Sequence, residues 1–372
     1  MSWVNAEDLE KYMSVLSQPP TDFIRERYSD VVSFTFDDIK LETTLISDEP
    51  WMELSEEPTI TIDNTEKKSV LNDDLNSLAT ILAYQKDRVR NIPEGNTVSD
   101  YMWNGDTYII DSPLDLSQPP SEIVLKKSDF YSVVSHTSRL IGEVLTQSDS
   151  SYRSKRRKYF DTTASLSRNI DSFYRPLGGT YLTVVLDENG TYYLLVGRRS
   201  DKVVFWPSVL TAFPAGYFKP NDISYGSVVE QHLLSEYSRE AMDGGKHSNN
   251  TSKGVNAITQ LLRSNNASFN ITGFGIEGFT VAAELTGVFM IENPEYTDYL
   301  FKNLEESYDV SHVTAVPLEN NAKSKIERML TDEEMTPQTA FALGNGLKYL
   351  DNQTDIDIPF EISVLFEDSP SN

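Results

Sequence analysis

Hydrophobic and polar positions alternate most regularly in the second half of the chain. Residues 178–200 contain two β-rich runs, TYLTVVL and TYYLLVG, on either side of Asp-Glu-Asn-Gly. Because Asn189-Gly190 strongly favours a tight turn, this segment predicts a β-hairpin. A helix is expected from about Gly226 to Met242, since two glycines that follow it favour helix termination.

Other segments add both helices and strands, so the pattern predicts an α/β (α+β) protein. Apolar side chains recur near helical spacing in 76–92, and 130–145 is typical of an amphipathic helix. Proline-containing turns bound two predicted strands, 106–113 and 121–130. We also expect helices in 258–265, 295–307 and 336–350, one or two buried strands in 270–294, and an extended piece in 310–318.

Changes in composition along the chain predict four parts. Residues 1–75 are acidic and rich in loops, although they contain short apolar clusters such as VVSFTF at 31–36. Five basic residues stand together in 153–158, where a solvated connector is expected and a phosphate-binding patch is the alternative. The predicted parts are an N-terminal α+β module of unassigned role at 1–150, a linker at 151–176, a larger domain at 177–352 and a disordered C-terminal tail at 353–372.

The charge of the chain limits its partners. Its 372 residues include 57 acidic and 32 basic side chains, for a formal net charge of −25. Such a chain repels nucleic acid backbones and anionic membrane surfaces, so neither is an expected partner. The composition would suit a protein from a high-salt cytoplasm; the alternative is an acidic mesophilic protein.

Several kinds of chemistry are excluded by the residues present. The chain has no cysteine, which excludes disulfides, thiolate metal sites and thiol catalysis. The N-terminus MSWVNAEDLEKYMSV lacks the pattern of a signal peptide, and no apolar run is long enough to span a membrane. We therefore expect a soluble cytoplasmic protein, and its oligomeric state is not predicted.

One short stretch, HLLSEYSREAM at 232–242, is the best candidate for chemistry. Glu236 and Glu240 lie one turn apart on one face of the predicted helix, with Arg239 between them. A solvated, salt-bridged helix face is the simplest interpretation. Alternatively, Mg²⁺ or Mn²⁺ draws the two carboxylates together, because these cations prefer oxygen ligands.

The order of these parts resembles the Nudix superfamily, whose signature is a glycine followed by an Arg-Glu-hydrophobic-x-Glu-Glu helix. Gly216 of FPAGYF matches the opening glycine, and Glu236 and Glu240 match two glutamates of the helix. The resemblance implies an α/β/α sandwich with a mixed sheet at 177–352. It also implies a Mg²⁺ or Mn²⁺ site formed by Glu236, Glu240 and a carbonyl of Ala215 or Gly216.

The function that the resemblance implies is hydrolysis of the pyrophosphate in a nucleoside diphosphate linked to another moiety. The ligand would be a nucleotide-type small molecule. Glu284, an acid within the apolar run VAAELTGVF, is a candidate catalytic group beside Glu236 and Glu240. Candidate substrate-binding residues are Arg198, Arg199, Gly216 and Phe218, and Phe205, Trp206 and Tyr217 are further aromatic candidates.

The helix also departs from the family pattern at three positions. Ser235 stands at the signature arginine, Arg239 at a glutamate and Ser227 at the upstream glutamate, and the spacing from Gly216 is five residues longer. These departures raise a second hypothesis, a catalytically weakened or inactive nucleotide-binding or regulatory module. A third hypothesis is a partner-binding protein whose function lies in the N-terminal half.

Overall fold

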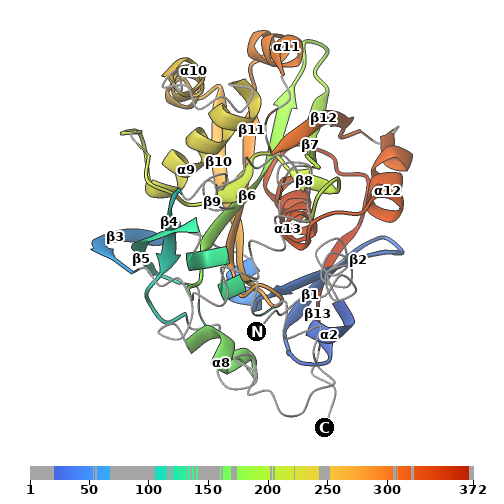
Figure 1. Ribbon diagram of the computed structural model, residues 1–372. Helices are drawn as coiled ribbons and strands as arrows, with labels where there is room; N and C mark the ends of the chain where they lie inside the picture. The colour runs from blue at the N-terminus through green and yellow to red at the C-terminus, as the bar shows by residue number, and fades with distance from the viewer. Residues whose placement is uncertain are drawn as a thin grey trace, which may run out of the picture.

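A large mixed sheet forms the centre of the computed structural model (Figure 1). The strand order is β12–β7–β6–β11–β10–β2–β1–β13, with β8 paired to β7 and β9 paired to β6. The strands are β1 (Val31–Phe36), β2 (Ile39–Ile46), β6 (Leu177–Leu186), β7 (Tyr192–Arg199), β8 (Leu210–Ala212), β9 (Ala215–Tyr217), β10 (Ala267–Glu277), β11 (Ala283–Ile291), β12 (Val310–Pro317) and β13 (Ile362–Glu367). The structure describes residues 21–52, 54, 57–67, 105–114, 118, 120–130, 132–134, 136–137, 140, 160, 162–168, 174–201, 203, 206–221, 223–242, 252–304, 307, 309–319 and 322–367.

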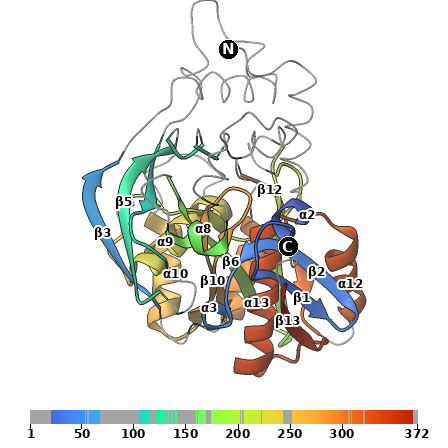
Figure 2. The same cartoon turned by 90° about the horizontal axis from the view of Figure 1, so that it is seen from below.

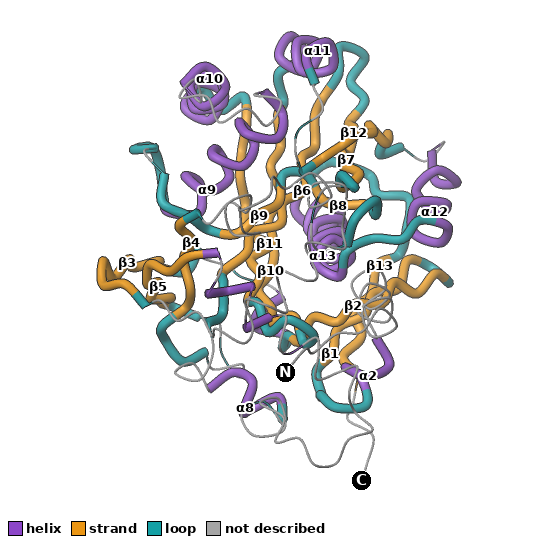
Figure 3. The backbone as a smooth tube through the Cα atoms, in the orientation of Figure 1, coloured by secondary structure: helices purple, strands orange, loops and turns teal. Residues whose placement is uncertain are grey.

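Helices cover both faces of this sheet, as the tube in Figure 3 shows. On one face α9, α10 and α11 contact β6 and β10. On the other face α12 contacts β2, and α13 contacts β1, β2, β6, β8, β10, β11 and β13. The predicted α/β/α sandwich with a mixed sheet is therefore confirmed. The helices are α2 (Thr21–Arg25), α3 (Glu49–Met52), α8 (Thr163–Arg168), α9 (Val228–Tyr237), α10 (Ser252–Arg263), α11 (Pro294–Asn303), α12 (Lys323–Asp332) and α13 (Pro337–Gln353).

Alternate side chains of β6 pack against the helices on the two faces of the sheet. Tyr181 and Val185 belong to the hydrophobic cluster under α9, whereas Leu182 and Val184 belong to the cluster under α13. Successive side chains of a strand point to opposite faces, so a continuous apolar run is buried on both sides. Strand β6 pairs in parallel with β11 and antiparallel with β7, which confirms the predicted hairpin.

A second sheet of three strands lies beside the face that carries α9 and α10, away from α12 and α13 (Figure 2). Its order is β3 (Thr59–Glu66), β5 (Glu122–Asp129) and β4 (Asp106–Ile110), which agrees with the two strands predicted near β4 and β5. The backbone N–H of Tyr108 donates to the carbonyl of Phe218 at 2.8 Å. The small sheet is thus joined directly to the segment after β9.

The structure differs from the predicted boundaries at both ends of the chain. Strands β1 and β2 lie within the predicted N-terminal module, and β13 lies within the predicted tail, yet all three belong to the large sheet. Val31–Phe36 pairs with Ile362–Glu367 across more than 300 residues of chain, a contact that local patterns do not encode. Helix α12 was also not predicted.

Two predicted helices lie wholly or partly outside the residues that the structure describes. The helix expected at 76–92 lies outside them. Of the segment 130–145, the residues described up to 140 are helical, in agreement with the prediction. Within the described part of the chain, no helix combines the length and the apolar character needed to cross a membrane.

Candidate functional site

Helix α9 begins with a capping box that explains one departure from the family pattern. The Ser227 side chain accepts from the Glu230 backbone N–H at 3.1 Å, and the Glu230 carboxylate accepts from the Ser227 N–H at 2.7 Å. These reciprocal bonds satisfy donors that a helix start leaves unpaired. Ser227 therefore has a structural role at the position where the signature has a glutamate.

The same helix ends in a π-helical turn, η2 (Ser238–Met242), so the predicted helix is confirmed with a change of winding at its end. Such turns are rare, and they occur frequently at functional sites. Arg239 and Glu240 lie within this turn, and Glu236 lies just before it.

Arg239 lies between the two candidate glutamates and bonds to both. Its Nε donates to Glu236 Oε2 at 3.1 Å, and its Nη2 donates to the same oxygen and to Glu240 Oε1, the latter at 3.0 Å. The glutamates are only 1% and 2% exposed. The structure therefore brings Glu236 and Glu240 together around a guanidinium group.

Strand β9 and Lys219, which follows it, also contact the two glutamates. Lys219 Nζ lies 2.7 Å from Glu236 Oε1, and the Ala215 N–H donates to Glu240 Oε2 at 3.3 Å. A Cβ atom on Gly216 would lie 2.5 Å from Glu236 Oε2. Gly216 is thus needed for this close approach of backbone and carboxylate, whatever ligand the site binds.

Burial and charge move the pKa values of the two glutamates in opposite directions. Burial alone would raise the pKa of Glu236, but the charges of Arg239 and Lys219 outweigh it and lower that pKa to about 2. Burial raises the pKa of Glu240 to about 8, although Arg239 opposes the rise. The two acids are therefore not equivalent.

The two arginines at the end of β7 point to opposite faces, as strand geometry requires. Arg198 donates to the Ser208 carbonyl at 2.8 Å and pairs with Glu333 at 2.6 Å, on the side of α12 and α13. Arg199 lies on the α9 side, where burial lowers its pKa while the charges of Asp309 and Glu240 oppose that change. Of the two, only Arg199 neighbours the glutamates.

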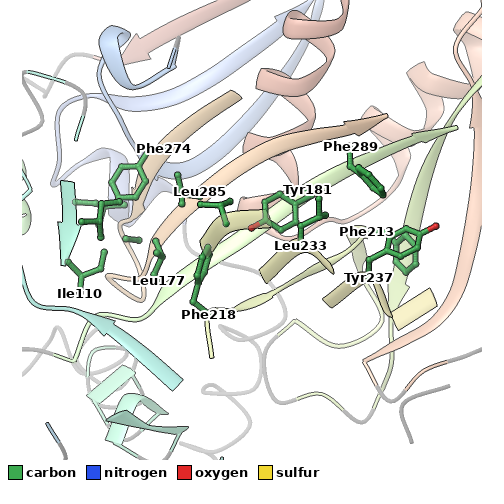
Figure 4. Packing of buried hydrophobic residues seen from close by; sticks show 14 of the residues in the cluster. Ile110, Leu177, Tyr181, Phe213, Phe218, Leu233, Tyr237, Phe274, Leu285 and Phe289 are labelled. Atoms are coloured by element: carbon green, nitrogen blue, oxygen red, sulfur yellow. The ribbon is translucent and has the colours of Figure 1, made fainter. Parts of the chain in front are cut away.

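Phe218 lies in the core and not at the surface of the site. Its ring is 2% exposed and stacks on His232 with the ring centroids 3.9 Å apart. His232 Nδ1 in turn lies 2.8 Å from the Tyr181 hydroxyl. Figure 4 shows Phe218 and Tyr181 among the buried side chains of this layer, so the geometry does not favour contact between Phe218 and a substrate.

The aromatic candidates near Phe218 are placed differently from one another. Trp206 is 6% exposed and belongs to the core cluster, while Tyr217 is partly exposed beside a smaller apolar cluster. Phe205 lies outside the described residues.

Glu284 lies on the opposite face of the sheet from Glu236. It faces Gly178 in the β6–β11 register and accepts from the Thr180 hydroxyl, both on the α13 side. Burial raises the pKa of Glu284 to about 8. The structure thus leaves this candidate catalytic group across the sheet from the other two.

A divalent metal does not fit the pair as the side chains are arranged. The guanidinium of Arg239 occupies the position between the carboxylates that a bridging cation would need. Among the described residues, no three His, Asp or Glu side chains are grouped as a metal site. Positive charge at this position comes from Arg239 and Lys219.

Two members of the cluster were not predicted from the sequence. Asp309 pairs with Arg239 Nη1 from the segment before β12, and Lys219 follows β9. The only sequence signal for Lys219 is its place just after FPAGYF, and no signal marks Asp309, which is 70 residues from Arg239 in the chain.

Comparisons with known proteins give distant likenesses. No family model matches the chain, and no curated protein matches it. Among solved structures, a Nudix hydrolase from Alicyclobacillus acidocaldarius has 12% identity and a TM-score of 0.29, over 49% of this chain and 98% of that one. The Nudix hydrolase RenU from M. smegmatis has 12% identity and a TM-score of 0.27, over 48% and 88%.

A third solved structure, a MutT/nudix family protein from Enterococcus faecalis, has 14% identity and a TM-score of 0.25. The match covers 39% of this chain and 44% of that protein, so the chain spans less than half of the length of that relative. All three are Nudix proteins, the family that the sequence pattern resembles.

Proposed function

We propose that this chain binds a nucleotide-type ligand at the Glu236–Arg239–Glu240 cluster and does not hydrolyse its pyrophosphate. The observation that supports this most is the bonding of one guanidinium to both glutamates. Metal-dependent hydrolysis needs a cation that activates water and neutralises developing charge. Here the oxygens that would hold such a cation already accept from Arg239.

Positive groups near the cluster support the choice of an anionic ligand. Arg239 and Lys219 have side chains that are 23% and 26% exposed, whereas the glutamates beneath them are buried. Arg199 neighbours the same group. Guanidinium and ammonium groups are the usual partners of phosphate in proteins.

The proposal is tested by measuring binding and turnover on the same samples. Thermal unfolding is followed with a panel of nucleoside diphosphates linked to sugars, nucleosides or other groups, in Mg²⁺, in Mn²⁺ and in EDTA. We expect a ligand that raises the unfolding temperature in all three conditions without release of nucleoside monophosphate. Melting that no ligand changes, or turnover that requires metal, would contradict the proposal.

The second candidate is a Mg²⁺- or Mn²⁺-dependent Nudix-type hydrolase. One observation favours it, which is the position of Glu236 against Gly216, with Glu240 on the next turn of the same helix. In that case Glu240→Gln would abolish metal-dependent release of nucleoside monophosphate. The control Glu295→Gln, an exposed position on α11, would leave it unchanged.

A further inference from the structure

We infer that Thr107 is a positioning residue for the proposed ligand site: by holding the Phe218 carbonyl, it sets where Lys219 lies against Glu236. The small sheet, which contains Thr107, thereby takes part in shaping the site. The inference deepens the proposed function. It rests on that function for the ligand, but not for the position of Lys219.

The carbonyl of Phe218 is the link between β4 and the site. It accepts from the Thr107 hydroxyl at 3.1 Å and from the Tyr108 backbone N–H at 2.8 Å. Thr107 is only 4% exposed, so water competes little for this bond. Because a carbonyl oxygen has two lone pairs, two donors satisfy it and fix its direction.

Fixing this carbonyl also fixes the start of Lys219. A peptide unit is planar, so the Phe218 oxygen and the Lys219 Cα belong to one rigid group. The other side of Phe218 is held as well, since its N–H donates to the Leu177 carbonyl at 2.8 Å and its ring stacks on His232. The Lys219 side chain therefore leaves the backbone from a defined point.

That point matters because a lysine side chain is long and flexible. Lys219 Nζ lies 2.7 Å from Glu236 Oε1, and the side chain is 26% exposed. Ordering such a side chain costs conformational entropy, and a fixed Cα limits the conformations that have to be lost. An ammonium group has three donors, so Lys219 can pair with Glu236 and donate to a ligand phosphate at the same time.

A test without ligand follows the ammonium group of Lys219 by proton–nitrogen correlation NMR of the full-length chain, with Lys219→Met to assign the signal. Thr107→Val keeps the shape of the side chain and removes the hydroxyl, while the Tyr108 N–H still donates to the same carbonyl. We expect the Lys219 signal to shift and broaden in Thr107→Val, because one of the two bonds that hold the preceding peptide is lost.

Two matched variants serve as controls for the NMR comparison. Thr107→Ser keeps a hydroxyl and should give the wild-type Lys219 signal. Thr61→Val removes the hydroxyl of an exposed threonine on β3 of the same sheet, where it bonds to Glu122 and not to Phe218. This variant should also leave the signal unchanged.

A double-mutant cycle then tests whether Thr107 acts through Lys219. Binding of ADP, a nucleoside diphosphate, is measured by calorimetry in EDTA for wild type, Thr107→Val, Lys219→Met and the double variant. We expect Thr107→Val to weaken binding by about two- to tenfold, the range that one net hydrogen bond gives. Once Lys219 is replaced, Thr107→Val should have no further effect. A purely structural role would weaken binding by the same factor in both backgrounds.

The outcomes separate this inference from the proposed function. A Lys219 signal typical of a freely moving lysine in wild type, an unchanged signal in Thr107→Val, or equal weakening in both backgrounds overturns the positioning role. Absence of ADP binding by wild type contradicts the proposed function for this ligand, and the NMR comparison then decides the inference alone. If Thr107→Val does not fold, Thr107→Ala takes its place, because it also lacks the hydroxyl.

Discussion

At the scale of single residues, Glu236 and Glu284 are buried on opposite faces of the sheet and their pKa values are shifted in opposite directions. Arg239 and Lys219 overcome the effect of burial at Glu236 and lower its pKa to about 2, whereas burial raises the pKa of Glu284 to about 8. Glu284 accepts a hydrogen bond from the neutral hydroxyl of Thr180. This hydrogen bond lowers the pKa of Glu284, but burial outweighs it, so the carboxyl group retains its proton to a higher pH.

Glu284→Gln tests this difference through the pH dependence of stability. The pKa of Glu284 is about 8 in the folded chain and 4.5 for an unperturbed group. Below pH 4.5 both states are protonated; as the pH rises towards 8 only the unfolded state releases the proton, so the free energy of unfolding falls. The limiting slope is about 1.4 kcal/mol per pH unit, and it ends above pH 8.

Glutamine cannot titrate, so urea unfolding from pH 5 to 8 should show a flatter pH dependence in Glu284→Gln than in wild type. The side-chain amide still offers an oxygen to Thr180. Equal pH dependence in the two proteins would mean that Glu284 is ionised in the folded state at neutral pH.

The sequence predicted part of this site and not its charge balance. Gly216, Glu236 and Glu240 lie together, as the resemblance implies, although the spacing from Gly216 is longer than in the signature. Asp309 and Lys219 come from other segments. A pattern of single residues does not encode which distant charges meet in the folded chain.

At the scale of elements, α13 packs unusually close to the sheet. A Cβ atom on Gly344 would lie 2.3 Å from ring carbons of Phe34, and one on Gly346 would lie 2.4 Å from Leu182 Cδ1. Glycine within a helix normally costs about 1 kcal/mol relative to alanine. The close contact with β1 and β6 explains why the sequence has glycine here.

Gly344→Ala should therefore destabilise the protein by about 1–2 kcal/mol, because overpacking exceeds the gain in helix propensity. The control is Asp351→Ala, at an exposed position of the same helix, which should change stability by less than about 0.5 kcal/mol. Urea unfolding measures both. A stabilised Gly344→Ala would contradict the close packing of α13.

Elements were predictable where their signals are local. The β6–β7 hairpin has an Asn-Gly turn, and two glycines follow the helix that contains α9, so both were found from the sequence. The places of β1, β2 and β13 in the sheet depend on partners far away in the chain. All three strands contact α13 only once the sheet is assembled.

At the scale of the whole molecule, the net charge of −25 lowers the free energy of unfolding. Like charges are closer together in the folded chain than in the unfolded one, so they repel more strongly. Salt screens this repulsion, with a Debye length of about 10 Å at 0.1 M and about 3 Å at 1 M. The thermal unfolding midpoint should therefore rise as NaCl is increased over this range.

A variant with fewer surface charges provides the control for the salt effect. Glu188, Asp201, Glu295 and Asp351 are exposed, and their replacement by Gln or Asn should reduce the dependence on salt. A midpoint that stays constant or falls with NaCl would show that repulsion among acidic side chains does not limit stability.

The central claim is that Arg239, and not a metal, bridges Glu236 and Glu240. The most direct measurement is a crystal structure of the wild-type protein soaked in Mn²⁺, with anomalous diffraction data. We predict guanidinium density between the two carboxylates and no anomalous peak there. An anomalous peak bound by Glu236, Glu240 and the Ala215 carbonyl, with Arg239 displaced, would contradict the claim and favour the metal-dependent hydrolase.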